Sequence, residues 1–199
     1  MWLREPVLIL TITVAVLGLL FAIRRILAET PIATSSDGAT SDAKDSRGNA
    51  GVIAPPPLIF LAFLALAAVL EALAPSTTAT LFPHARYVAG AVFFIIGVLI
   101  GIAGVRGLRA AATNISTDLP ATALVVDGIY GRSRNPLYLA MTLIYIGLAI
   151  AAGSGWAIAL LLPLLVLMHV GVIAREEGYL EQKFGDMYRQ YKSRVRRWL

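Results

Sequence analysis

Long apolar segments without charge alternate with short polar segments along the chain. Uncharged runs occupy residues 6–23, 48–70 and 87–105, and a fourth run, residues 135–174, contains no Asp, Glu, Lys or Arg. Each of the first three supplies one membrane span of about 20 residues. The fourth would form a helix of roughly 60 Å, about twice the hydrocarbon thickness of a bilayer, so we expect a hairpin that turns at the Gly-Ser-Gly of residues 153–155. The pattern predicts an all-α, polytopic membrane helical bundle of about five transmembrane helices.

The segments between the apolar runs divide the chain into three parts. Arg24 and Arg25 follow the first run directly, and no small-residue cleavage site comes after them, so residues 1–28 are predicted to form a retained transmembrane anchor. Residues 29–54 are polar and turn-rich, which is typical of a flexible cytoplasmic linker. Residues 55–199 are then expected to contain a core of four membrane helices.

Two finer patterns bear on how this core packs. Gly97 and Gly101 have the small-xxx-small spacing that lets membrane helices approach closely. After residue 174 apolar side chains recur every three or four positions, which predicts one C-terminal amphipathic helix along the cytoplasmic interface. The residues of this stripe are Leu180, Phe184, Tyr188, Tyr191 and Val195.

Composition agrees with a membrane protein. The 199 residues are 58% hydrophobic and 15% charged, and their mean hydropathy is +0.75, far more apolar than an ordinary soluble domain. The chain has no cysteine, which excludes disulfides, thiolate catalysis and Cys-based metal sites. No group of His, Asp and Glu has the spacing of metal ligands, so we expect no metal.

The basic residues indicate the orientation in the membrane, because loops rich in Lys and Arg stay cytoplasmic. If the N-terminus lies outside, only Arg4 and Arg86 of the 17 Lys and Arg residues remain outside with it. We therefore expect a multi-pass protein of a bacterial inner membrane with its active site on the cytoplasmic face. Topology and attraction to anionic membrane lipids account for the net charge of +5, so no nucleic-acid partner is expected.

Two polar clusters flank the predicted hairpin, at residues 132–138 and 175–188. The hairpin returns both clusters to the same membrane face, where arginines, a tyrosine and the paired carboxylates Glu176 and Glu177 can converge on one site. Acidic residues are also common in the first turn of a helix because the macrodipole favours them there, so a purely structural role for Glu176 stays open.

Three motifs, in this order along the chain, carry a resemblance to a known family: Leu124-Val125-x-x-Gly128-Ile129-Tyr130, Arg134-Asn135-Pro136-x-Tyr138 and Glu176-Glu177-x-x-Leu180-x-x-x-Phe184-Gly185-x-x-Tyr188-x-x-Tyr191. In combination they are similar to those of the isoprenylcysteine carboxyl methyltransferase and phospholipid N-methyltransferase superfamily of integral membrane enzymes. The resemblance implies S-adenosylmethionine as methyl donor, bound between residues 122–138 and the C-terminal helix. The residues that match the family's cofactor contacts are Thr122, Ala123, Leu124, Val125, Tyr130, Asn135, Pro136, Leu137, Tyr138 and Glu176.

The sequence departs from the family pattern at two positions. Asn135 stands where many members carry histidine, and Val172 stands where carboxyl-methylating members place a substrate-binding arginine. These departures weaken the case for recognition of a prenylcysteine carboxylate, although Arg175 is a candidate substitute for the missing arginine.

The candidate catalytic residues depend on the acceptor. A carboxylate or thiolate acceptor needs a nearby cation, for which Arg134 and Arg175 are the candidates, whereas an amine acceptor needs a base, for which Glu177 or His169 is the candidate. We expect a methyltransferase for a lipophilic acceptor, with O-methylation of an isoprenylcysteine-type carboxylate or a small lipophilic acid or thiol favoured. The alternatives are N-methylation of a phosphatidylethanolamine-type lipid and a non-enzymatic membrane scaffold. The sequence does not indicate an oligomeric state.

Overall fold

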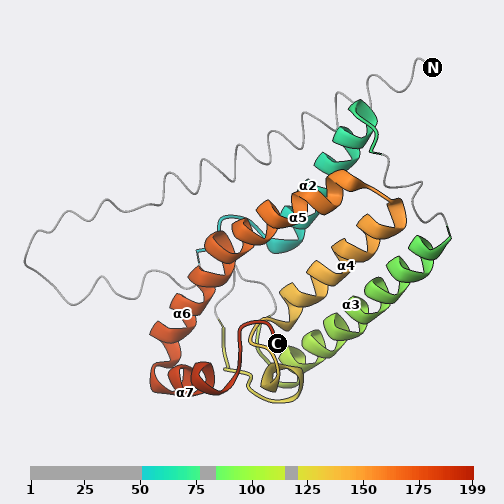
Figure 1. The fold of residues 1–199 in the computed structure, drawn as a ribbon. Coiled ribbons are helices and arrows are strands. Elements are labelled where there is room, and N and C mark those ends of the chain that lie inside the picture. The colour runs from blue at the N-terminus through green and yellow to red at the C-terminus, as the bar shows by residue number, and fades with distance from the viewer. Residues whose placement is uncertain (1–50, 77–83, 115–120) are drawn as a thin grey trace, which may run out of the picture.

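The computed structural model describes residues 51–76, 84–114 and 121–199, which are helical and contain no strand (Figure 1). The expected anchor over residues 1–28 and the linker up to residue 50 lie outside the described residues. The elements are α2 (Pro56–Leu73), α3 (Ala85–Ala110), the 3-10 helix η2 (Gly128–Gly131), α4 (Pro136–Ala152), α5 (Gly155–Met168), the π-helix η3 (His169–Ile173), α6 (Ala174–Phe184) and α7 (Asp186–Arg194).

The apolar helices confirm a membrane bundle. Pro56–Leu73, Ala85–Ala110 and the continuous run Gly155–Phe184 are each long and apolar enough to cross a membrane, and the shorter helix Pro136–Ala152 is also apolar. Helix α3 packs along α4, and α2 packs along α5 (Figure 1). The predicted all-α membrane fold is confirmed for this part of the chain.

The predicted hairpin is formed by α4 and α5. Helix α4 begins at Pro136, whose missing N–H costs little in the first turn. It ends at Gly153, which has φ of 65° and caps the helix in the left-handed conformation that glycine adopts readily. Ser154 then caps α5 by accepting a hydrogen bond from the Ala157 amide at 3.2 Å. Local turn chemistry therefore places the bend where the uncharged run had to fold back.

Glycines set the distance between α3 and α4. A Cβ atom at Gly90 would lie 2.7 Å from the Gly147 carbonyl oxygen, and one at Gly97 would lie 2.8 Å from the Ala140 carbonyl oxygen. A Cβ atom at Gly101 would meet only the Ala140 Cβ, at an ordinary 3.5 Å. The close contacts are at Gly90, Gly97 and Gly104, which are seven residues apart. The expected pair of Gly97 and Gly101 therefore does not set the helix spacing, because only Gly97 of the two makes a close contact.

The core includes residues that precede α2. Val52 and Ile53 are buried, and the Ile53 amide donates a hydrogen bond to the Gly171 carbonyl in η3 at 3.4 Å. The sequence placed these two residues at the end of the flexible linker, whereas in the structure they pack with α2, α4 and α5. Packing against the helices therefore begins N-terminal to residue 55, where the sequence placed the end of the linker and the start of the core.

The C-terminal region contains two helices in place of the single amphipathic helix expected from the stripe. Helix α6 continues α5 through η3, and Gly185, with φ of 53°, separates α6 from α7. Helix α7 turns away from the axis of α6, and the chain then runs back toward the start of α4 (Figure 1). This arrangement brings the last residues of the protein next to the first polar cluster.

Candidate active site

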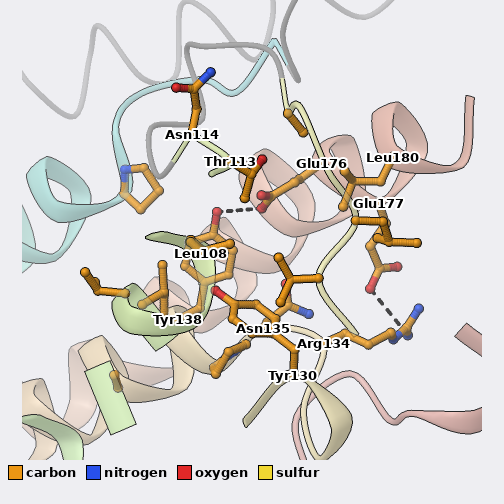
Figure 2. A pocket seen from close by; sticks show the side chains of 18 of the residues that line it. Leu108, Thr113, Asn114, Tyr130, Arg134, Asn135, Tyr138, Glu176, Glu177 and Leu180 are labelled. Carbon is orange, nitrogen blue, oxygen red and sulfur yellow. Dashed lines mark hydrogen bonds and ion pairs between the residues drawn. The ribbon is translucent and has the colours of Figure 1, made fainter. Parts of the chain in front are cut away.

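A cavity of about 600 Å³ lies where the two polar clusters meet (Figure 2). Its walls come from the C-terminal part of α3, residues 121–125, the start of α4, and helices α6 and α7, with Pro55, Pro56 and Pro57 on one side. The volume is in the range of sites for small molecules and cofactors. The two ends of the hairpin therefore border a cavity at one end of the bundle.

A short hydrogen bond joins the two clusters inside the cavity. The Tyr138 hydroxyl, from the first turn of α4, donates to Glu176 Oε2, from the first turn of α6, at 2.6 Å (Figure 2). Both side chains line the cavity, and Tyr138 is buried. The bond fixes one oxygen of the carboxylate and leaves the other available to a ligand, since an ionised carboxylate accepts several hydrogen bonds.

Three further tyrosines form the wall on the side of α7. The Tyr191 hydroxyl donates to the Tyr130 carbonyl at 2.7 Å, and the rings of Tyr188 and Tyr191 meet edge to face at 6.1 Å. Burial, aided by nearby Glu176, raises the pKa of Tyr130, and burial likewise raises the pKa of Tyr191. These phenols are therefore protonated at neutral pH and act as hydrogen-bond donors and apolar ring surfaces.

Residues 121–125 are held in place as a wall of the site. The buried hydroxyl oxygen of Thr113 accepts hydrogen bonds from the Thr122 and Ala123 amides at 3.0 and 3.3 Å, and the Tyr179 hydroxyl accepts from the Ala121 amide at 3.2 Å. The Thr122 hydroxyl donates to the Ala112 carbonyl at 2.9 Å. Thr122 thus holds this segment in place. Its neighbours Ala123, Leu124 and Val125 line the cavity.

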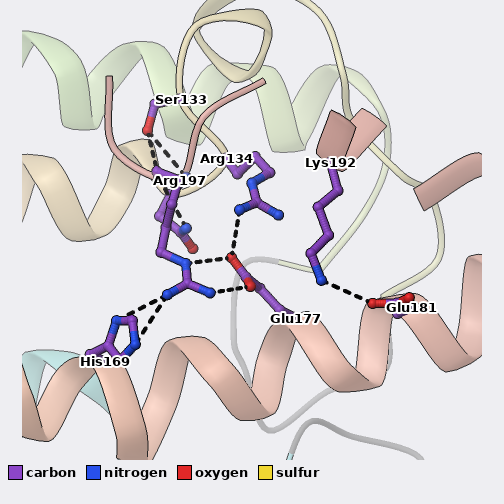
Figure 3. A network of polar contacts seen from close by, with 8 residues as sticks. Ser133, Arg134, His169, Glu177, Glu181, Lys192 and Arg197 are labelled. Carbon is purple, nitrogen blue, oxygen red and sulfur yellow. Dashed lines mark hydrogen bonds and ion pairs between the residues drawn. The ribbon is translucent and has the colours of Figure 1, made fainter. Parts of the chain in front are cut away.

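Glu177 is the centre of a buried charge network at the edge of the site (Figure 3). The Arg197 guanidinium binds it at two points, with Nε 2.9 Å from Oε1 and Nη2 2.6 Å from Oε2, and Arg134 Nη2 lies 3.3 Å from Oε1. The side chain of Glu177 is 7% exposed. The hydrogen bonds to Glu177 raise the pKa of Arg197. Glu177 is therefore the shared counter-ion of two arginines.

Arg134 is the buried cation of the cavity. Its side chain is 9% exposed, and Nε and Nη1 have no hydrogen-bond partner among the described residues. The Tyr188 hydroxyl is a close neighbour: burial and Glu177 raise its pKa to about 12 although Arg134 acts to lower it. Neither Nε nor Nη1 forms a hydrogen bond with the Tyr188 hydroxyl. Arg134 thus retains two unpaired donors next to the site.

The structure brings together most of the candidate site residues singled out from the sequence and leaves three apart. Those that line the cavity are Ala123, Leu124, Val125, Tyr130, Arg134, Asn135, Pro136, Leu137, Tyr138, Glu176 and Glu177. Thr122 is exposed and does not line the cavity, and Arg175 Nη1 donates to the Gly51 carbonyl at 3.0 Å, away from the lining residues. His169 contacts Arg197 and does not line this cavity either. Val172 is fully buried in the core. Among the described cations, the structure favours Arg134 over Arg175 for contact with a ligand.

Sequence reasoning missed Arg197. Its carbonyl accepts from Asn135 Nδ2 at 3.2 Å, and its Nη1 lies 3.1 Å from the ring nitrogens of His169, which therefore faces the C-terminal tail (Figure 3). The signal that points to such a residue is the second carboxylate of the Glu176–Glu177 pair, since a charge next to an apolar span needs a partner. Several basic residues near the C-terminus are candidates for this partner, and only the folded structure shows that it is Arg197.

The fold and the site together define a helical membrane protein whose hairpin ends enclose a small-molecule cavity. The model of the phospholipid methyltransferase family matches residues 85–187, just over half of the chain, which include the first polar cluster and all of the second except Tyr188. The chain belongs to this family, which makes it a membrane methyltransferase. It is also 43% identical over 63 residues to a protein of Haemophilus influenzae described as uncharacterized, a match that covers 32% of this chain and 100% of the other. No solved structure matches.

Proposed function

We propose that the protein transfers a methyl group from S-adenosylmethionine to a lipophilic acceptor at the cytoplasmic face of a bacterial inner membrane, with its N-terminus outside. The observation that carries the proposal is the Tyr138–Glu176 pair, which joins the two clusters inside the cavity. S-adenosylmethionine would supply an activated methyl group on a positively charged sulfur. The cavity suits such a molecule because it combines a carboxylate, aromatic faces and apolar walls.

The residues of the chain have distinct parts in this proposal. The free oxygen of Glu176 accepts a hydrogen bond from the donor's ammonium or hydroxyl groups, and the rings of Tyr130 and Tyr138 attract a sulfonium through their quadrupoles. Residues 121–125 and the apolar start of α4 shield the site from water. Methyl transfer mainly requires alignment of the two reactants in a dry site, which these residues provide.

An apolar arm of the cavity supports a lipophilic acceptor. This arm is the part of the lining that includes Gly101 and Val105 of α3 and Ile144 of α4. Helix α3 is long and apolar enough to cross a membrane, and α4 is a shorter apolar helix. The buried guanidinium of Arg134 at the polar end favours an acceptor with a negatively charged oxygen, and therefore O-methylation.

A second candidate is N-methylation of an amine-bearing phospholipid, which the phospholipid methyltransferase match favours. In that case Arg134 would contact the lipid phosphate. Incubation of the purified protein with methyl-labelled S-adenosylmethionine and a total membrane lipid extract separates the two, because O-methyl esters release label on mild alkaline hydrolysis and N-methyl products do not.

The cofactor site is tested by binding of S-adenosylhomocysteine in isothermal titration calorimetry. Glu176→Gln should weaken binding about tenfold or more, because it removes a charged hydrogen-bond acceptor. Tyr138→Phe should weaken it less, since the carboxylate then loses only its orienting donor. The matched control is Glu181→Gln on the same helix, whose carboxylate pairs with Lys192 at 3.2 Å outside the cavity and whose replacement should leave affinity unchanged. Wild-type affinity in both Glu176→Gln and Tyr138→Phe would refute the assignment.

The acceptor arm is tested at Gly101. Gly101→Leu should place a side chain in the arm and lower turnover of a long-chain acceptor about tenfold, because filling the arm removes the apolar contacts of the chain. Affinity for S-adenosylhomocysteine should stay unchanged, and Gly101→Ala, whose Cβ has ordinary room, should behave like the wild type. Full turnover in Gly101→Leu would show that the acceptor does not use this arm.

A further inference from the structure

We propose that Arg197, in the C-terminal tail, is a positioning residue that keeps Arg134 directed into the cavity, where Arg134 binds the carboxylate of a ligand. The inference rests on the proposed function, because it concerns recognition of a substrate in the same site. The carboxylate could belong to the amino-acid part of the methyl donor or to an acidic acceptor.

The first observation is the unequal division of Glu177 between two arginines. Arg197 occupies both carboxylate oxygens with the two-point geometry that gives the strongest ion pairs, at 2.9 and 2.6 Å. Arg134 makes a single contact with Glu177, from Nη2 at 3.3 Å. Glu177 therefore neutralises the charge of Arg134 but contacts only one of its nitrogens.

The second observation is that the tail is fastened to the residues around Arg134. The Arg134 amide donates to the Arg196 carbonyl at 3.0 Å, and the Arg197 carbonyl accepts from Ser133 Oγ at 3.3 Å and Asn135 Nδ2 at 3.2 Å. Trp198 packs against the hydrophobic core. Contacts to three consecutive residues therefore fix the tail beside the segment that contributes Arg134 to the cavity lining.

The third observation is the pair of unused donors on Arg134. Nε and Nη1 are buried and have no hydrogen-bond partner among the described residues, and Arg134 is one of the residues that line the cavity. Buried donors are costly to leave unpaired, and an anionic oxygen satisfies them with charge-assisted hydrogen bonds. Without Arg197, both oxygens of Glu177 would become available and Arg134 would form the two-point pair itself, which would withdraw its donors from the cavity.

The test measures how strongly binding depends on a carboxylate. For the methyl donor the probes are S-adenosylhomocysteine and methylthioadenosine, which lacks the amino-acid part. For an acidic acceptor they are palmitate and methyl palmitate, with the full-length protein in nanodiscs. The wild type should prefer the carboxylate-bearing member of at least one pair by about tenfold or more. That pair identifies the source of the carboxylate.

The variants separate positioning from mere structural support. Arg197→Ala should abolish the preference, and Arg197→Lys, which keeps the charge but loses the two-point contact, should reduce it. Adding Glu177→Gln to Arg197→Ala should restore the preference to within about threefold of the wild type, since Arg134 then has no carboxylate to pair with except the ligand's. Lys192→Ala removes a nearby positive charge whose partner is Glu181, and it should have no effect.

Two results would overturn the inference: an intact preference in both Arg197 variants, or a double variant no better than Arg197→Ala, as expected if Arg197 only supports the fold. If Arg197→Ala does not fold, Arg197→Lys with and without Glu177→Gln makes the same comparison. Absence of any carboxylate preference in the wild type also overturns it. Failure of the wild type to bind S-adenosylhomocysteine would instead refute the proposed function, while the palmitate pair still decides the role of Arg197.

Discussion

Replacement of Glu177 with alanine should lower the free energy of unfolding by about 3 to 5 kcal/mol. Glu177 is the counter-ion of Arg134 and Arg197, whose side chains are 9% and 28% exposed. Removal of a buried carboxylate leaves the cations without compensation in a region of low dielectric constant, and this cost exceeds the value of the pair itself. The midpoint of thermal unfolding in detergent should fall by roughly 6 °C or more.

The comparison variant for this prediction is Glu181→Ala, on the same helix. Its ion pair with Lys192 spans 3.2 Å between side chains that are 34% and 42% exposed, so its loss should cost less than about 1 kcal/mol. Equal effects of the two substitutions would mean that the Glu177 network is hydrated and contributes no more than a surface pair.

The sequence predicted the hairpin and the meeting of its ends because both follow from strong physical constraints. An uncharged run too long for one span must fold back, and glycine at Gly153 marks the bend through its left-handed conformation. Once the bend is placed, the connectivity itself brings Tyr138 near Glu176. No knowledge of side-chain packing was needed for this step.

The sequence did not predict where the C-terminal helix breaks. The apolar stripe keeps its helical spacing across Gly185, so periodicity gives no sign of an interruption. The break depends on a positive φ at Gly185, which glycine permits but does not require. Because the position of Arg197 depends on this break, the charge network around Glu177 was also outside the reach of the sequence.

Arg175 shows a second limit, because neighbours in sequence lie about 100° apart around a helix. Arg175 and Glu176 are adjacent in α6, yet Glu176 faces the cavity and Arg175 reaches Gly51. The apolar stripe does not define the inward face of the helix closely enough to separate neighbouring residues. The sequence pattern alone therefore could not decide whether Arg134 or Arg175 contacts the ligand.

Glycine packing between α3 and α4 leads to the second large prediction: Gly147→Ala should destabilise the protein by about 3 kcal/mol, at the upper end of the usual cost of overpacking. A Cβ atom at Gly147 would lie 2.7 Å from both the Gly90 carbonyl oxygen and the Phe94 amide nitrogen. These are backbone atoms of α3 that cannot rotate away, so the helices must separate. In a membrane, close packing is a main source of helix association, and its loss is not offset by burial of apolar surface.

Gly101→Ala is the matched control, because it makes the same chemical change on α3 where the new Cβ meets only the Ala140 Cβ, at 3.5 Å. It should leave the unfolding midpoint in an SDS titration unchanged, whereas Gly147→Ala should shift it to lower SDS. Separation of α3 from α4 would also displace Leu108 of α3 relative to Tyr138 of α4, both of which line the cavity, so S-adenosylhomocysteine binding should weaken in Gly147→Ala alone. If both variants unfold together, the close approach of α3 and α4 is not what holds these helices, and the glycines at seven-residue spacing have another role.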